Sequence, residues 1–411
     1  MKMLKPKIAL FILFAVSIMF FSNDFGLIDI EKTAIITAIA IDKTEEGDYL
    51  VTCQIAVPEA SNATKENQKA QITAKGNTVA GALKTTGSLS GWFPQTIFCN
   101  LIIVGNDLTS ENLITVLDYF SKTMRVQDSA QVILAEKKAK DLLSATTPLD
   151  NISSFAIQKI LLKNPGFDQD VRAVDIKTFC VGYYSQNASS YMPMVKLLDL
   201  QGKEQSSNGQ GEQSGSSGSG GSSEGGNSSD SSGGDSGNKT EGKNLFDATT
   251  TALFVKGVKV GELDKELTRT FNFLTKKING SAFAVKDVSG YNYLLSVLDS
   301  ENKITVKATE KGLDVCTSIN LYCRISDQNT QGSSSSFEKN SAIPDVVKKK
   351  AETQIEQSIL DLFEVSKTTG CDFLQIKQKL YRFNHKQYSR YKDNYLDALN
   401  LTVKVAVNGQ R

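Results

Sequence analysis

The stretch Leu313-Asp-Val-Cys-Thr-Ser-Ile-Asn-Leu-Tyr-Cys-Arg-Ile325 alternates between two kinds of side chain along its whole length. The odd-numbered positions are apolar except for Thr317, and the even-numbered positions, apart from Cys316, are polar. Successive side chains of a strand point to opposite faces of a sheet, so this period of two predicts a β-strand with one face turned to the core. The elements on either side of it then decide what covers that face.

The rest of the C-terminal half predicts a sheet covered by helices. The longest helix has apolar residues along one side and begins at a proline, a residue favoured in the first turn. We expect, in chain order, a hairpin over 251–260 turning at Lys256 and Gly257, a helix capped by Asp264, strands near Ser281, Leu294 and Ile304, a helix from Pro344 to Gly370, a shorter helix with Phe373, Ile376, Leu380 and Phe383, and a closing strand from Leu401 to Val407.

The N-terminal half alternates strand and helix, which indicates an α/β domain. Apolar runs mark the strands, and spacings of three and four residues mark the helices. We expect a hairpin of Thr33–Asp42 with Tyr49–Val57, a strand near 71–74, a helix from Asn77 or Thr78, a buried strand over Ile97–Val104, a helix capped by Thr109 or Ser110, a strand over 131–135 and a helix over 136–145.

A tract from Gln201 to Asn244 separates these halves and consists almost entirely of Gly, Ser, Asn, Gln and charged residues. It has too little apolar surface to offset the entropy of ordering its backbone, so we expect a disordered linker. It could be a loop inside one domain or a tether between two, and the apolar patterns on both sides favour a boundary. The predicted fold is therefore α/β (α+β). Two or three mixed-sheet domains carry helices packed on the sheets, with an N-terminal domain at 23–200 and a C-terminal domain at 245–411.

The N-terminus predicts export. Lys2, Lys5 and Lys7 precede an unbroken apolar run from Ile8 to Phe21, which is typical of a secretory signal. The small-residue cleavage pattern is poor, so residues 1–22 are either a cleaved signal or a retained membrane anchor, and we favour retention. Either alternative places the remaining chain in contact with a membrane on its extracytoplasmic side.

Composition excludes one class of partner. The formal net charge is +1, whereas a nucleic-acid-binding face normally needs a clustered positive excess. The six cysteines are scattered without metal-ligand spacing. On one strand Cys316 and Cys323 would lie roughly 23 Å apart on opposite faces, so they should not pair. We expect unpaired, structural cysteines.

No motif advertises catalysis. The sole histidine, His385, lies in a basic polar stretch without an orienting carboxylate, and neither a Gly-x-Ser-x-Gly elbow nor a His-Glu-x-x-His pair occurs. Glu45, Glu46 and Asp48 fit a hairpin turn better than an acidic metal loop. We therefore predict a protein that is not an enzyme, with no catalytic, cofactor-binding or metal-binding residues and no cofactor. The sequence assigns no ligand-binding residues.

Several segments, in this order, resemble the Ger(x)C family, the C subunits of nutrient-germinant receptors of bacterial spores. The segments are Gly26–Lys32 leading into Ile39–Lys43, Gly76–Thr78 with Ala82 and Leu83, Asn100–Gly105, Phe254–Asp264, Asp372–Leu374, and Leu380 with Tyr381. The resemblance implies a non-enzymatic, extracytoplasmic subunit of a membrane receptor complex acting in spore germination. It also implies two integral membrane partners, one of them transporter-like, at the spore inner membrane.

The chain departs from this family at its lipid attachment point. Family members typically carry a lipidated cysteine just after the signal, whereas the first cysteine here is Cys53, within a predicted strand. The departure indicates a divergent member. The alternative function is a membrane-tethered solute-binding module unrelated to germination.

Overall fold

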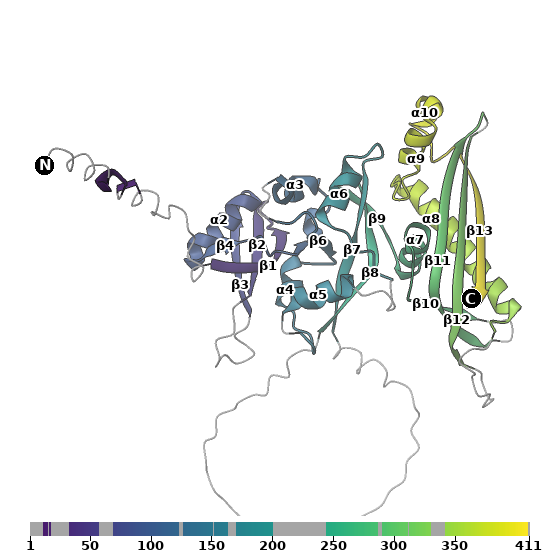
Figure 1. The fold of residues 1–411 in the computed structure, drawn as a ribbon, viewed down its shortest axis with the longest axis horizontal. Helices are drawn as coiled ribbons and strands as arrows, with labels where there is room; N and C mark the ends of the chain where they lie inside the picture. The colour runs from purple at the N-terminus through teal and green to yellow at the C-terminus, as the bar shows by residue number, and fades with distance from the viewer. Residues whose placement is uncertain are drawn as a thin grey trace, which may run out of the picture.

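The computed structural model describes residues 11–14, 16–17, 33–56, 69–122, 126–150, 152–162, 170–199, 244–286, 290–310, 312–329 and 342–409. Within them the chain forms one nine-stranded and one four-stranded sheet, called here the large and the small sheet, with helices packed on both (Figure 1). The predicted α/β (α+β) class with mixed sheets is confirmed.

The large sheet runs in the order β3-β2-β1-β5-β6-β7-β8-β9, and β4 pairs with the start of β1. Its central strands β1, β5, β6 and β7 are parallel, and antiparallel hairpins extend it at both ends. The strands are β1 (Thr33–Lys43), β2 (Tyr49–Ala56), β3 (Lys69–Gly76), β4 (Phe93–Gln95), β5 (Leu101–Val104), β6 (Gln131–Ala135), β7 (Ser189–Asp199), β8 (Asn244–Val255) and β9 (Val258–Leu263).

Helices cover both faces of the large sheet, as the two sides of the sheet in Figure 1 show. On one face α2 (Val79–Ser90), α3 (Ile114–Lys122) and α6 (Ile176–Tyr183) bury one set of strand residues, including Ile102 and Val104. On the other face α4 (Ala139–Ser144) and α5 (Ser153–Leu161) bury the alternate set, including Leu101 and Ile103. Strands buried on both faces read as continuous apolar runs, which is why β5 showed no alternation.

The Gly/Ser tract connects β7 to β8, and these strands are antiparallel neighbours whose pairing runs from Ser189↔Val255 to Asp199↔Asn244. The predicted domain boundary at residue 245 lies at the start of β8, and strands from both sides of this boundary belong to the large sheet. Strands β8 and β9 complete the large sheet, so the tract joins two strands of a single sheet.

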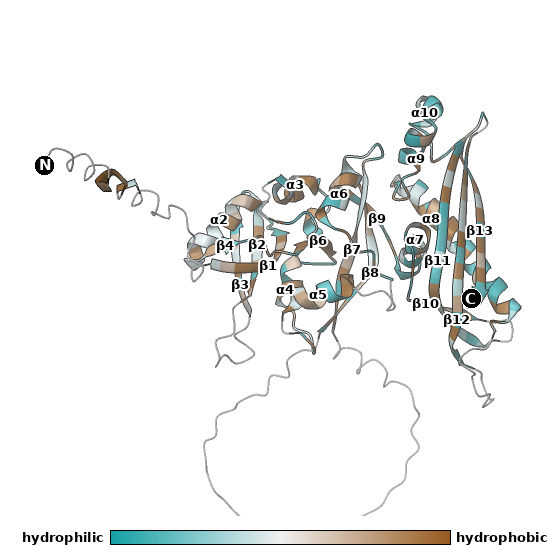
Figure 2. Ribbon diagram, in the orientation of Figure 1, coloured by the Kyte–Doolittle hydropathy of each residue, from teal (hydrophilic) through white to brown (hydrophobic). Residues whose placement is uncertain are grey.

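The small sheet has the order β10-β11-β12-β13, and it comprises β10 (Ser281–Lys286), β11 (Asn292–Ala308), β12 (Leu313–Asn329) and β13 (Leu399–Gly409). The alternation that opened the sequence analysis is confirmed, because every odd-numbered residue from Leu313 to Ile325 is buried. Figure 2 shows the resulting bands of apolar and polar residues along β12 and β13. The even-numbered residues of β12 from Asp314 to Arg324 are exposed or partly exposed, so this face of the strand is open.

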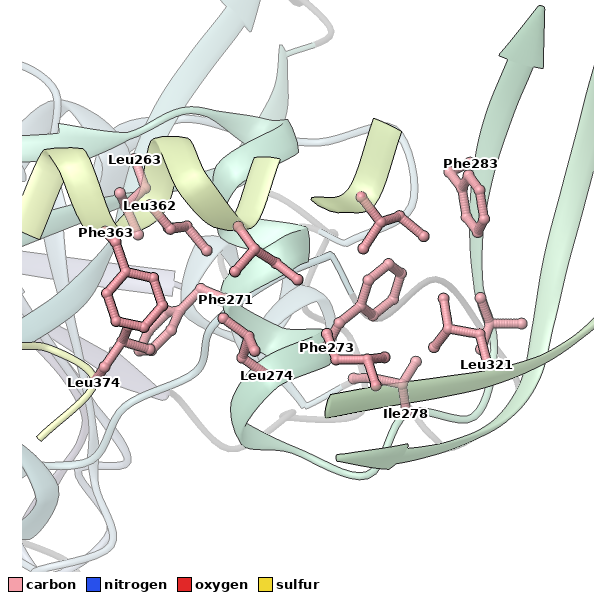
Figure 3. Packing of buried hydrophobic residues seen from close by; sticks show 14 of the residues in the cluster. Leu263, Phe271, Phe273, Leu274, Ile278, Phe283, Leu321, Leu362, Phe363 and Leu374 are labelled. Atoms are coloured by element: carbon pink, nitrogen blue, oxygen red, sulfur yellow. The ribbon is translucent and has the colours of Figure 1, made fainter. Parts of the chain in front are cut away.

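The buried face of the small sheet packs on α7 (Lys265–Thr275), α8 (Asp345–Thr369) and α9 (Ile376–Phe383), with the short α10 (His385–Tyr391) following. Phe271 of α7, Phe363 of α8 and Leu374 lie together in this core (Figure 3). The predicted caps are confirmed at Asp264, which accepts from the Leu267 N–H at 2.8 Å, and at Gly370, which ends α8 in the left-handed conformation.

Some predicted boundaries were wrong. Strand β5 begins at Leu101, because Ile97 and Phe98 lie on an exposed turn. Helix α3 begins at Ile114, where the side chain of Asn112 accepts the backbone N–H of Ile114, so neither Thr109 nor Ser110 caps it. The separate strands expected near Leu294 and Ile304 are the single strand β11. No element was predicted between residues 146 and 188, where α5 and α6 form, or for β7.

The predicted N-terminal anchor lies mostly outside the described residues. Residues 11–14 and 16–17 are helical. None of the helices described here is both long and apolar enough to span a bilayer. The anchor prediction therefore gains no support from a spanning helix, and signal cleavage stays a prediction.

Candidate functional site

His385 occupies an exposed position at the start of α10, where no catalytic group accompanies it. Its imidazole packs edge-on against Tyr381 and stacks parallel to Tyr388, with ring centroids 5.2 Å and 6.4 Å away. Within the described residues, no carboxylate forms an ion pair with this ring. A base for nucleophilic catalysis needs an orienting acid and shielding from water, and His385 shows neither.

Two of the three acids in the turn of the first hairpin pair with a lysine. Lys75 of β3 forms ion pairs with Glu46 and, at 3.1 Å, with Asp48. In the part of the chain that the structure describes, no group of three or more His, Cys, Asp or Glu residues could hold a metal ion. The turn therefore has a structural explanation that requires no metal.

Asp42 is the second-last residue of β1, at the carboxyl edge of the parallel strands, where open α/β sheets commonly bind ligands. Its carboxylate is 1% exposed and accepts the backbone N–H groups of Ala139 at 2.6 Å and Lys140 at 2.9 Å. Burial raises the pKa of Asp42, while these two hydrogen bonds oppose that rise. The acid thus stabilises the start of α4, and a Cβ on Gly105 would lie only 2.3 Å from it. This edge of the sheet is filled by its own polar groups.

A second buried acid, Asp372, joins the two sheets. It is fully buried, and its two carboxylate oxygens accept the N–H groups of Ile376 and Lys377, each at 2.8 Å, at the start of α9. The side chain of Asn187, just before β7, donates to both the carbonyl and the carboxylate of Asp372, and the backbone N–H of Asp372 donates to the Ser189 hydroxyl. Burial raises the pKa of Asp372 to about 6. We call this junction the seam.

Arg172 is the central cation of the seam. It is 8% exposed and donates to Asn272 at 3.3 Å and Thr275 at 2.9 Å at the end of α7, and to the Tyr191 hydroxyl of β7 at 2.8 Å. Its guanidinium also lies over the rings of Tyr191 and Phe271. All of these partners are neutral. Within the described residues, Arg172 forms no ion pair with a carboxylate.

A cavity of about 320 Å³ lies along the seam beside Arg172. Lys379 lies in its wall, and none of the described residues that line it is acidic. Burial lowers the pKa of Lys379, and burial together with Arg172 lowers the pKa of Lys276 to about 8. Gln375, also in the wall, adopts a left-handed conformation at φ 58 that is uncommon for a non-glycine residue. The cavity could accept a small anion.

A larger groove of about 940 Å³ opens between α7, α8 and the end of β10. Its walls carry charges of both signs, including Glu266, Lys349 and Asp361. Glu266 already accepts from Gln354 at 3.1 Å and Ser358 at 3.4 Å, so its carboxylate holds α7 to α8. The groove shows no convergent set of groups for a particular ligand.

Sequence analysis missed the seam. The sequence around Asp372 resembles a family motif, but its partners Asn187 and Ser189 lie far away in the sequence, and no residue pattern indicates that they meet. Arg172 carried no signal either, because a lone arginine before an unpredicted helix is unremarkable. The one available clue was Asp372 itself, an acid placed directly before an apolar helical pattern, as helix caps often are.

Both parts of the chain match family descriptions from the same group of proteins. Residues 27–197 match "Spore germination protein N-terminal domain", and residues 249–410 match "Spore germination B3/GerAC like, C-terminal". The chain belongs to the GerAC-like family of spore germination proteins. The two matches flank the Gly/Ser tract, and the resemblance drawn from the sequence motifs is confirmed.

One curated relative and one solved structure extend this finding. The chain is 28% identical to spore germination protein KC of Bacillus subtilis (strain 168) over 145 residues, which span 32% of this chain and 35% of that protein. The match thus covers about a third of the relative's length. The crystal structure of the GerBC protein resembles the fold with a TM-score of 0.51 at 14% identity, covering 93% of this chain and all of that one. This likeness concerns the fold alone.

Proposed function

We propose that this GerAC-like protein is the C subunit of a membrane nutrient-germinant receptor and works outside the cytoplasm without catalysing a reaction. The observation that carries the proposal is the pair of family matches, which together span both sheets. The proposed partners are two integral membrane subunits, one of them transporter-like, and the membrane surface. Nucleic acid is not among them, given the balanced charge.

The chemistry of the buried acids supports a binding or assembly role. Buried carboxyls with raised pKa values are the usual starting point for an active site. Here Asp42 and Asp372 each accept two backbone N–H groups at a helix start, so both acids have structural partners. Both carboxylates therefore hold the starts of α4 and α9 in place.

Two experiments test this proposal. Deleting the gene, in a strain without a paralogue that could replace it, should abolish the germination response to at least one nutrient. Affinity purification of the full chain from spore membranes should recover two integral membrane proteins in constant ratio. Unchanged germination in every nutrient would overturn the proposal.

The cavity beside Arg172 favours a second candidate, a membrane-tethered solute-binding module that takes a small anion. Acetate and phosphate are suitable probes, and either should raise the melting temperature of the full chain if it binds there. Lys379→Met should remove that rise, whereas Lys350→Met, in the larger groove, should not. Neighbouring genes separate the candidates, since frames for two membrane subunits favour the receptor and transport ATPase genes favour the solute-binding module.

A further inference from the structure

Five large apolar side chains lie exposed close together in the sequence at one end of the large sheet. They are Leu89, Trp92, Phe93, Ile97 and Phe98, which we call the apolar rim, and each is between 45% and 67% exposed. Scattered exposed apolar residues are common, but soluble proteins rarely gather several large ones. The rim is therefore expected to be covered by a binding partner or by lipid.

The local structure holds these side chains outward. Gly91 ends α2 in the left-handed conformation at φ 69, and the chain then turns through Trp92 into β4. Gly87 of α2 lies so close to β4 that an added Cβ would meet Pro94 at 3.1 Å. With the helix and the strand packed this closely, Trp92 and Phe93 remain at the surface.

The second part of the rim is the tip of a tight turn. The Cys99 N–H donates to the Thr96 carbonyl at 2.9 Å, so Ile97 and Phe98 are the two central residues of the turn. Thr96 and Cys99 are buried, whereas both central residues point to the surface. Turn tips ordinarily carry Gly, Asn, Asp, Ser or Pro, so an Ile-Phe tip is unexpected for a turn that faces water.

The position of the rim indicates the occupant. Strand β4 pairs with the first residues of β1, Thr33↔Phe93 and Ala34↔Pro94, so the rim lies where the chain enters the large sheet. The apolar run Ile8–Phe21 lies a short stretch upstream in the sequence. In Figure 1, α2 and β4 occupy the end of the molecule opposite the small sheet.

The charge of this segment agrees with that position. No charged residue occurs from Thr85 to Asn106, so the segment that carries the rim brings no carboxylate of its own that would repel an anionic headgroup or lose hydration on approaching lipid. Tryptophan and other aromatic residues favour the boundary between headgroups and acyl chains, where one end of the ring is apolar and the other is wet.

We propose that the apolar rim rests in the headgroup region of a lipid bilayer and orients the large sheet toward the membrane, with the small sheet facing away. The inference rests on the membrane association included in the proposed function. It adds the surface that makes the contact.

Trp92 is the only tryptophan of the chain, so its fluorescence reports on the rim alone. The full chain would be reconstituted in vesicles of phosphatidylglycerol and phosphatidylethanolamine, with and without bromine atoms on the acyl chains. Trp92 emission should shift to shorter wavelength, and brominated lipid should quench it by about twofold, because an indole at headgroup level lies within reach of the bromines.

A matched control places the only tryptophan on α9, beside the small sheet. In the double variant Trp92→Phe, Phe383→Trp, the sole tryptophan occupies a position on α9 that is 78% exposed. Its emission should keep the wavelength of an indole in water, and brominated lipid should not quench it. A second variant, Ile97→Asp with Phe98→Asp, charges only the exposed turn tip. It should keep its melting temperature and lose the quenching of Trp92.

Three outcomes would overturn the inference. Trp92 could stay aqueous in vesicles, both reporters could be quenched equally, or Trp92 could become shielded only when the integral membrane subunits are present. The last result would assign the rim to a protein contact. None of them affects the gene-deletion test, so the rim and the proposed function fail separately.

Discussion

The two sheets differ in how many of their faces are buried. Adjacent residues of β5 in the large sheet, such as Ile102 and Ile103, are both fully buried but belong to different core clusters on opposite faces. Adjacent residues of β12 in the small sheet differ, because Ile319 is fully buried while Asn320 lies on the open face. Apolar and polar residues therefore alternate along a strand when one of its faces is covered, and the alternation disappears when both faces are covered.

The largest expected effect tests this comparison with pairs of adjacent residues. Ile102→Ala and Ile103→Ala should each lower the free energy of unfolding by about 2–5 kcal/mol, since each empties a packed site. On β12, Ile319→Ala should cost a similar amount, and Asn320→Ala less than about 0.5 kcal/mol. Urea denaturation measures all four. A small loss for Ile103→Ala alone would show that the second face of the large sheet is poorly packed.

The seam between the two sheets gives the next effect, which depends on pH. The pKa of Asp372 is raised to about 6 from an ordinary 3.8, so the folded protein binds this proton more tightly than the unfolded chain. The stability contributed by this carboxyl is present below about pH 4 and is lost as the pH rises through 6. Between those limits the wild type should lose on the order of 3 kcal/mol relative to Asp372→Asn.

The control for this titration is Asp345→Asn, because Asp345 is almost fully exposed at the start of α8. It should follow the wild type across the whole pH range. If Asp372→Asn also followed the wild type, the carboxyl would not be titrating in the folded seam.

A smaller effect concerns the tract between β7 and β8. Because these strands pair directly, replacing residues 201–243 with a short Gly/Ser loop should leave the fold intact. Each halving of the loop length lowers the entropic cost of closing the loop by about 0.6 kcal/mol. The replacement halves the length about three times, so it should raise the free energy of unfolding by about 2 kcal/mol.

Cleavage at a protease site inserted in the tract provides the complementary measurement. The two fragments should remain together in gel filtration, since β8 pairs with β7 and Leu253 of β8 lies in the core of the small sheet. Separation of the fragments would indicate a tether between independent domains.

The smallest effect distinguishes the two cysteines of β12. All six cysteines are free, as predicted. Cys323 is buried, and burial raises the pKa of its thiol to about 12, whereas Cys316 is partly exposed on the open face. A thiol reagent at pH 8 should label Cys316 in the native protein and Cys323 only after unfolding, as peptide mass spectrometry would show. Equal labelling would contradict the one-sided burial of the small sheet.

Much of the fold could be predicted because local patterns report burial. The β12 alternation, the cap at Asp264 and the start of α8 after Pro344 each depend on residues close together in the sequence. The large sheet was harder, because a run buried on both faces does not show where its strand ends, and the apolar turn at Ile97 and Phe98 therefore looked like part of β5.

The seam and the junction of the sheets could not be predicted for a different reason. Strand β7 contains Pro193, which argues against a central strand when only the sequence is considered. The contacts of Asp372 with Asn187 and Ser189 depend on how the finished sheets meet. Such contacts leave no periodic signal in the sequence.

The most direct test of the central claim is nutrient germination of spores that lack this gene and any paralogue. The proposed function predicts that these spores lose the response to at least one nutrient and that the wild-type chain, expressed in trans, restores it. Spores that germinate normally in every nutrient tested would contradict the claim.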